Sequence, residues 1–170
     1  MLEIIIGIGI PGSGKTTRLK PIANEGGFVY ICPDDIREEM TGSTLDQSKN
    51  KEVWNEATIR LSRALSEGKS VVLDATMVNA GQRQDIIAFS RAVGAKKITG
   101  AFFDTPLDVA KVRNKLREKQ VPEYAIDRLE GQLRSAPPTI SDGFDLLQVY
   151  GREGELISEI SREAKAEGES

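Results

Sequence analysis

Histidine is absent from this chain of 170 residues. Its absence excludes Ser-His-Asp hydrolysis, histidine-ligated zinc and imidazole acid–base catalysis. Any general base must therefore be a carboxylate, a lysine, a tyrosine or a water molecule. Cysteine is nearly absent as well: the single one, Cys32, excludes an internal disulfide and is compatible with a reducing compartment. We expect Cys32 to be a small buried hydrophobic residue at the end of a strand.

Long apolar runs are also lacking. No stretch approaches the roughly 18 residues that suggest a membrane span, and the N-terminus lacks the basic flank of a signal peptide. Met1 leads almost directly into the first predicted strand, so we expect no targeting segment and a cytoplasmic protein with no membrane contact. The net charge of −3 gives no global attraction to nucleic acid, so a polyanionic partner would require a local basic patch.

A complete phosphate-binding motif is present near the N-terminus. Residues 9–16 read GIPGSGKT and match G-x-x-x-x-G-K-[ST], directly after the apolar run at residues 2–8. A short strand, a glycine loop and a helical sequence in this order are the context that the P-loop requires. The sequence therefore predicts a site for a nucleoside triphosphate, which we expect to be ATP.

The role of each P-loop residue follows from its chemistry. Backbone N–H groups converge on phosphate oxygens where glycines allow the turn, and the following helix N-terminus adds positive potential. We expect Lys15 to reach the β- and γ-phosphates and the Thr16 hydroxyl to hold Mg²⁺. The residues expected to bind the nucleotide in this segment are Gly12, Ser13, Gly14, Lys15, Thr16 and Thr17.

An overlapping pattern supports a rival interpretation. Residues 7–12 satisfy G-x-G-x-x-G, the dinucleotide fingerprint, and Asp34 and Asp35 lie near the distance at which that fingerprint needs an acidic residue. The rival pattern is looser and leaves residues 14–16 unexplained. The P-loop interpretation is therefore favoured.

Apolar strand-like runs alternate with helical stretches along the chain, which is typical of a parallel sheet covered on both faces. Strands are expected at residues 2–8, 28–31, 69–74, 97–103 and 145–150, and helices at 14–24, 34–40, 47–67, 80–93, 106–118 and 123–134. This pattern predicts an α/β protein with the three-layer P-loop NTPase/kinase fold, a five-stranded parallel sheet and a helical lid, as a single domain over residues 1–170.

Two features of the helices need separate mention. Trp54 shares a helical stripe with apolar neighbours, which favours core packing over stacking on a base. At the C-terminus, Leu156, Ile157, Ile160 and Ala164 keep helical spacing, so a terminal helix is expected over about residues 153–166.

Carboxylates follow two of the predicted strands. Asp34 and Asp35 come after the second strand, which we expect to lie beside the P-loop strand, where ligands bind in doubly wound sheets. One carboxylate could accept a proton from an acceptor hydroxyl, with Arg37 holding an anionic group of the acceptor one helical turn on. Aspartates also cap helices, so we expect one of the pair to be functional and the other to be the cap. Asp74 ends the third strand, where P-loop proteins brace the metal water or the acceptor site.

The densest basic cluster lies just before the break at Val121-Pro122. A run of this kind is often only a solvated helix surface. Beside the break, it suggests a mobile lid over about residues 113–122, which lowers Arg113 and Arg117 over the triphosphate and excludes water. The cluster consists of Lys111, Arg113, Lys115, Arg117 and Lys119.

Two other classes of P-loop protein fit less well. A switch GTPase needs Asn-Lys-x-Asp, whereas residues 114–117 read NKLR and end in the wrong charge. A motor ATPase usually places a glutamate after its strand-end aspartate, whereas Asp74 is followed by Ala75. A kinase needs only a carboxylate near the acceptor hydroxyl and cations around the migrating phosphoryl group.

Four segments of this chain together resemble the kinase domain of bacteriophage-type 5′-polynucleotide kinases, over about residues 4–132. They are PGSGKT at residues 11–16, DDIR at 34–37, LDATMVN at 73–79, and the stretch from Arg113 to Pro122. The resemblance implies Mg²⁺-dependent transfer of phosphate from ATP to the 5′-hydroxyl of RNA or DNA. It also implies that Asp34 is the general base, Arg37 holds the acceptor's phosphate, Asp74 steadies the acceptor site and Arg117 clamps the donor phosphates.

The resemblance is incomplete. The Asp-x-Asp-Gly-Thr motif of the phosphatase domain that accompanies the best-known members is not found in this chain. The wider family also includes kinases that act on aminoacyl-tRNA or on small molecules, and these acceptors stay open. A nucleotide-gated binding protein without kinase activity is a third hypothesis, although no residue in the sequence requires it. The sequence does not indicate the oligomeric state.

Overall fold

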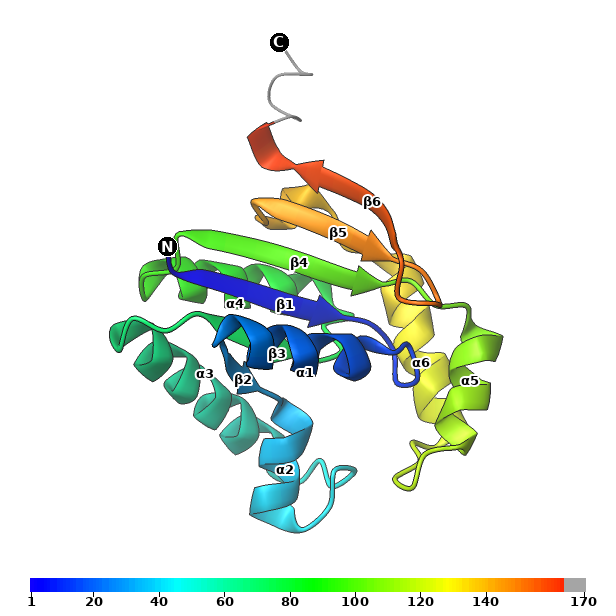
Figure 1. Cartoon of the computed structure of the whole chain (residues 1–170). Coiled ribbons are helices and arrows are strands. Elements are labelled where there is room, and N and C mark those ends of the chain that lie inside the picture. Colours follow the sequence, from blue (N-terminus) through cyan, green and yellow to red (C-terminus); the bar gives the residue numbers. More distant parts are fainter. Residues whose placement is uncertain (164–170) are drawn as a thin grey trace.

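A six-stranded sheet runs through the centre of the protein, in the order β2-β3-β1-β4-β5-β6 (Figure 1). The computed structural model describes residues 1–163. Strands β1 to β5 are parallel, and β6 pairs antiparallel with β5. The strands are β1 (Glu3–Ile8), β2 (Val29–Ile31), β3 (Val71–Asp74), β4 (Lys97–Phe103), β5 (Leu146–Tyr150) and β6 (Leu156–Ser161).

Helices cover both faces of this sheet, as the alternating sequence pattern predicts. The α-helices are α1 (Lys15–Gly26), α2 (Pro33–Thr41), α3 (Asn50–Ser66), α4 (Ala80–Ala92), α5 (Leu107–Lys115) and α6 (Glu123–Ser135), followed by the 3₁₀ turn η1 (Ile140–Asp142). Over residues 1–163, no helix is both long and apolar enough to cross a membrane.

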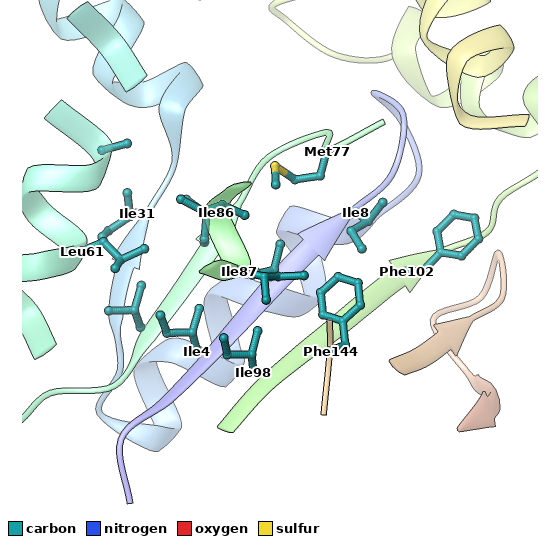
Figure 2. Close-up of a cluster of buried hydrophobic side chains, with 14 of the residues drawn as sticks. Ile4, Ile8, Ile31, Leu61, Met77, Ile86, Ile87, Ile98, Phe102 and Phe144 are labelled. Carbon is teal, nitrogen blue, oxygen red and sulfur yellow. The ribbon is translucent and has the colours of Figure 1, made fainter. Parts of the chain in front are cut away.

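Alternation along the strands divides the core into two layers. Ile4 and Ile8 of β1 lie in the larger cluster with Leu61 of α3 and Ile86 of α4 (Figure 2). Ile5 packs instead against the smaller cluster on the other face, which includes α1 side chains. Successive strand residues point to opposite faces, so a strand that is apolar throughout must be covered on both sides. The predicted three-layer α/β arrangement is confirmed.

The predicted terminal helix is wrong. Residues 156–161 form β6, an antiparallel edge strand in which Leu147 of β5 lies opposite Ile160. The chain reverses at a tight turn, where the Gly151 N–H donates to the Glu155 carbonyl and Gly154 has a φ of 79°. Pairing with the free edge of β5 satisfies backbone groups that a terminal helix would have left open. The predicted segment 164–166 lies outside the described residues.

The prediction that the second strand lies beside the P-loop strand is also wrong. β3, not β2, lies beside β1, with Ile4 opposite Val71 and Gly7 opposite Asp74. β2 is the edge strand and pairs only with β3 among the described strands. Even so, the five parallel strands end at one edge of the sheet, which is where ligands bind in such folds. The residues after β1, β2 and β3 therefore share that edge.

Candidate active site

The P-loop connects the end of β1 to the start of α1. Gly12 and Gly14 have φ angles of 85° and 88°, a region that favours glycine. A side-chain carbon at Gly12 would lie 2.2 Å from the carbonyl oxygen of Ala110 in α5, so the loop is packed directly against that helix. Gly14 is the N-cap of α1, and no side chain forms a capping hydrogen bond at this end of the helix. The backbone N–H groups of the first turn of α1 are therefore free of side-chain caps.

Ser13 holds the centre of this loop. Its carbonyl accepts a 3.0 Å hydrogen bond from the Thr105 hydroxyl, which ties the loop to the chain after β4. Its own hydroxyl is buried and has no hydrogen-bond partner within the described chain. A buried hydroxyl without a partner is costly, so a group that fills the loop and accepts or donates a hydrogen bond there is favoured.

Asp74 joins three elements at the end of β3. Its side chain is buried, and Oδ2 accepts a 2.7 Å hydrogen bond from the Thr16 hydroxyl at the start of α1. The same oxygen accepts the hydroxyl of Tyr30 from β2. Burial and the charge of Asp74 raise the pKa of Tyr30, so the phenol stays protonated and remains a donor. Sequence reasoning missed Tyr30 because its role depends on β2 lying next to β3.

The start of α2 differs from its predicted form. The helix begins at Pro33, with Cys32 as an extended N-cap, so Asp34 and Asp35 lie in the first turn. No side chain caps this helix, and the prediction that one of the two aspartates is the cap is therefore wrong. Proline suits the first helical position because its missing N–H would have no partner there. Both carboxylates instead lie close to the positive end of the helix dipole.

Arg37 reaches back along α2 to Asp34. Its Nη1 lies 2.5 Å from Asp34 Oδ1, and its Nη2 donates a 2.7 Å hydrogen bond to Asn50 Oδ1 at the start of α3. The Arg37 side chain is only 6% exposed, whereas that of Asp34 is 62% exposed. The Arg37 Nε–H is buried without a partner in the described chain. Asn50 had no signal in the sequence, because it is recognised only by its contact with Arg37.

Asp35 faces a different environment from Asp34. Partial burial raises its pKa, Lys20 opposes this shift, and the charges of Asp74 and Asp34 add to it. Asp35 therefore lies within the electrostatic field of the Asp74 carboxylate. Burial, with a further contribution from Asp74, also raises the pKa of Cys32 to about 11, so its thiol is uncharged at neutral pH. Cys32 is half-buried, not fully buried as expected.

The predicted lid corresponds to the last residues of α5 and the loop that leads to α6. Asn114 is buried and closes the base of this loop with two hydrogen bonds to the Val121 backbone, of 2.8 Å and 2.9 Å. In Figure 1 the loop extends beyond α5 and α6 at the same end of the molecule as α2. Lys119 on the loop contacts Glu38 of α2, so the tip of the loop reaches this helix.

The two lid arginines occupy different positions. Arg113 lies beside the P-loop, with Nη1 3.5 Å from where a side-chain carbon of Gly14 would be, and its Nη2 donates to the Arg152 carbonyl. Arg117 is exposed and pairs with no side chain among residues 1–163. Arg113 is thus at the expected site, whereas Arg117 is not in contact with it in this conformation.

A cavity of about 640 Å³ opens beside the P-loop. Its walls come from the loop, α1, the end of β4, α5 and the β5–β6 turn. The residues that line it are Ser13, Gly14, Thr17, Arg18, Pro21, Ile22, Glu25, Phe103, Arg113, Glu153 and Gly154. The structure therefore brings four of the predicted nucleotide-binding residues, Ser13, Gly14, Thr17 and Arg113, to one cavity.

Comparison with known proteins agrees with this architecture. A model of the family described as AAA domain (AAA_33) matches residues 4–136. A protein of Acanthamoeba polyphaga mimivirus, named as a bifunctional polynucleotide phosphatase/kinase, is 29% identical over 115 residues. That match covers 68% of this chain but only 24% of the viral protein.

Solved structures with the same fold include kinases of different kinds. A chain of the Pnkp1/Rnl/Hen1 RNA repair complex has a TM-score of 0.70 and 24% identity, over 79% of this chain and 44% of that one. A sugar kinase from Janibacter sp. HTCC2649 has a TM-score of 0.64 and 20% identity, over 91% of this chain and 88% of that one. The protein thus belongs to the AAA domain family whose model matches it, and these structures show that it has the P-loop kinase fold.

Proposed function

We propose that this protein transfers the γ-phosphate of ATP to the 5′-hydroxyl of an RNA or DNA strand. The observation that carries the proposal is the pairing of an exposed carboxylate, Asp34, with a buried arginine, Arg37, at the sheet edge that also carries the P-loop. A polynucleotide kinase activity in the name of the viral relative supports the same acceptor class. A carboxylate beside a fixed cation suits an acceptor with a hydroxyl next to a phosphate.

The residues at the P-loop fit a triphosphate with Mg²⁺. The unpartnered Ser13 hydroxyl and the uncapped first turn of α1 both favour an anionic oxygen. Thr16 and Asp74 supply neighbouring oxygens, and no cluster of three or more acidic or cysteine side chains among the described residues could hold a metal ion by itself. Mg²⁺ usually takes one or two protein oxygens, with waters and substrate phosphates, so this donor set suits it. When bound, the ion neutralises charge on the transferred group.

The acceptor side relies on this chain's own groups. Asp34 accepts the proton of the 5′-hydroxyl as its oxygen bonds to the γ-phosphorus and the bond to the leaving β-phosphate oxygen breaks. Because Asp34 is more than half exposed, an acceptor can reach it. Arg37 holds the phosphate that follows the 5′ nucleoside, because its guanidinium lies beside Asp34 at the same sheet edge. Lys15 and Arg113 orient the donor phosphates from the opposite side.

The lid completes the site by moving. Arg117 lies on the exposed loop between Asn114 and Val121, outside contact with the P-loop. Closure of this loop brings its guanidinium to the γ-phosphate and excludes water, which would otherwise compete with the acceptor hydroxyl. The hydrogen bonds of Asn114 fix the two ends of the loop while its tip moves.

A transfer assay tests the proposal. The protein is incubated with γ-labelled ATP, Mg²⁺ and 5′-hydroxyl oligonucleotides of RNA and DNA, with 5′-phosphorylated oligonucleotides as the control acceptor. We expect label on the 5′-hydroxyl strands alone, and its loss in the variant Lys15→Met. ATP binding without transfer to either oligonucleotide would contradict the proposal.

A second candidate is phosphorylation of a small hydroxyl compound, because the sugar kinase fold covers 91% of this chain. The same assay with a panel of sugars, hydroxy acids and aminoacyl-tRNA decides between the two. Transfer to a member of the panel without transfer to oligonucleotides would favour the second candidate. ATP binding with no transfer to any acceptor would instead indicate a nucleotide-gated binding protein.

A further inference from the structure

A second cavity, of about 660 Å³, lies between α3 and α4, away from the P-loop. Its apolar wall consists of Trp54, Ile86 and Phe89, and its polar wall includes Asn79, Gln82 and Asp85. None of these residues has a part in the phosphoryl transfer proposed above. A concave site with an aromatic wall and a few polar groups is the usual form of a ligand site.

The position of this cavity connects it to the acceptor side. Arg37 donates to Asn50 at the start of α3, and Trp54 lies one helical turn further along the same face of that helix. On the other side, α4 begins at Ala80, a short loop after Asp74 at the end of β3. The cavity therefore lies at the sheet edge that carries Asp34. Along α3, it begins one turn after Asn50, the residue that Arg37 contacts.

The chemistry of the walls suits a nucleobase. Trp54 and Phe89 are each half-buried and pack against the core, with the cavity on their remaining side. Aromatic side chains stack on any base, and amide and carboxylate groups hydrogen-bond the edges of bases. The described lining contains neither lysine nor arginine, so the cavity is not built for a phosphate. Trp54 thus packs against the core, as expected, but it also lines the cavity.

We propose that this cavity binds the base of the second nucleoside of the acceptor strand, stacked on Trp54. The inference rests on the proposed function, because Arg37 must hold the phosphate that joins the first nucleoside to the second. A strand that leaves Arg37 toward Asn50 enters the cavity with its next base. The enzyme would then prefer single-stranded 5′ ends, since a base that lies in the cavity cannot pair with a complementary strand.

Trp54 is the single tryptophan of the chain, so its fluorescence reports directly on the cavity. Emission is measured while 5′-hydroxyl trinucleotides are added, in the presence of ADP and without any chemical step. We expect quenching by the intact trinucleotide, and both loss of quenching and about tenfold weaker binding when the second nucleoside is abasic. An abasic third nucleoside serves as the control and leaves the quenching intact. Equal quenching with and without the second base would overturn the inference.

Variants add a test that does not depend on fluorescence. For each variant, kcat/KM for a trinucleotide is divided by kcat/KM for a nucleoside 3′-phosphate that carries a 5′-hydroxyl. Trp54→Ala should lower this ratio about tenfold, whereas Trp54→Phe, which keeps a stacking ring, should restore most of it. Phe89→Leu is a second route should Trp54→Ala not fold. Phe28→Leu, at a half-buried aromatic residue in the opposite core layer, is the matched control.

The two proposals fail in distinguishable ways. Transfer to oligonucleotides with no quenching and an unchanged ratio in Trp54→Ala would overturn the cavity inference and leave the proposed function standing. Absence of transfer to every 5′-hydroxyl oligonucleotide would overturn the proposed function. Quenching that still requires the second base would in that case support a strand-binding cavity on a protein with a different acceptor chemistry.

Discussion

The Thr16 hydroxyl donates a 2.7 Å hydrogen bond to the Asp74 carboxylate and so joins the first turn of α1 to the end of β3. Because Tyr30 donates to the same carboxylate oxygen, three elements of the fold meet at one buried charge. This arrangement orients the threonine oxygen that we propose as a ligand of Mg²⁺. Groups that orient a metal ligand typically change metal affinity 10- to 100-fold when they are replaced.

Replacement of Asp74 should therefore change the metal requirement. We expect Asp74→Asn to raise the Mg²⁺ concentration for half-maximal transfer about 10- to 100-fold, measured by titration at fixed ATP. Tyr30→Phe removes the other hydrogen bond to Asp74 but keeps Thr16 in place, so it is the control and should have a smaller effect. An unchanged Mg²⁺ requirement in Asp74→Asn would show that Asp74 has no part in binding the metal ion.

The neighbouring aspartates of α2 can be separated by a pair of isosteric variants. We expect Asp34→Asn to lower kcat by at least about 10²-fold, because a positioned general base contributes about that much, with ATP binding unchanged. Asp35→Asn should reduce kcat far less, since Asp34 is the residue paired with Arg37. Single-turnover transfer and nucleotide titration measure the two quantities. The opposite ranking would make Asp35 the base.

The two lid arginines should affect different kinetic constants. Arg113 already lies at the P-loop, so Arg113→Ala should raise KM for ATP. In the proposed mechanism Arg117 acts only when the lid closes, so Arg117→Ala should lower kcat, by about 10³-fold if it stabilises the transition state as arginine fingers do. Lys115→Ala, on the same exposed segment, is the control. A rise in KM for ATP in both arginine variants, with kcat intact, would mean that Arg117 only binds the donor.

The pKa of Asp35 predicts a pH-dependent stability effect. Partial burial raises this pKa above the usual 3.8, and nearby carboxylates raise it further against the opposing effect of Lys20. As pH rises through this range, the unfolded chain loses its proton first, so the folded state becomes less stable relative to it. The loss of stability is complete once the pH exceeds the pKa of Asp35 in the folded protein. We expect Asp35→Asn to raise Tm at pH 7, and the gain over the wild-type protein to shrink at pH 3. A gain of equal size at both pH values would point to packing instead of charge.

Arg83 provides a prediction about stability alone. The side chain is fully buried and donates to Asp142 over 2.8 Å, to the Met77 carbonyl over 2.9 Å and to the Ala136 carbonyl over 2.7 Å. Arg83→Met leaves the buried Asp142 carboxylate unpaired, so we expect a loss of about 3–5 kcal/mol in the free energy of unfolding. Denaturant titration followed by circular dichroism measures this loss.

The matched control for Arg83 is Arg60→Met. Arg60 forms comparable ion pairs with Glu39 and Glu56, but on the surface of α3. Exposed pairs contribute little, so this variant should cost less than about 1 kcal/mol. Equal losses in the two variants would show that burial of the Arg83 network adds nothing to stability.

Local signals in the sequence were sufficient for much of this molecule. The P-loop spacing, the five parallel strands and the helices between them depend on neighbours in the chain, and Gly12 and Gly14 have the backbone angles expected of such a loop. The acidic residues after β2 and at the end of β3 also fall at one sheet edge, because parallel strands all end on the same side.

The remainder depended on pairing between distant segments. Ile157 and Ile160 fit a helical pattern, but the free edge of β5 recruits residues 156–161 as a strand instead. The order of β2 and β3 beside β1 leaves no trace in composition. Tyr30 and Asn50 therefore had no recognisable signal, because each acquires its role only through a contact with another element.

The tight contact between Gly12 and Ala110 restricts how the protein can open. Not even a methyl group fits between Gly12 of the P-loop and Ala110 of α5, so this helix cannot move closer to the loop. Arg113 lies one turn further along α5, so we expect it to stay beside the P-loop whether the lid loop beyond Asn114 is open or closed. Under the proposed function, ATP can therefore bind at the P-loop while the lid is open, which favours binding of ATP before the acceptor strand.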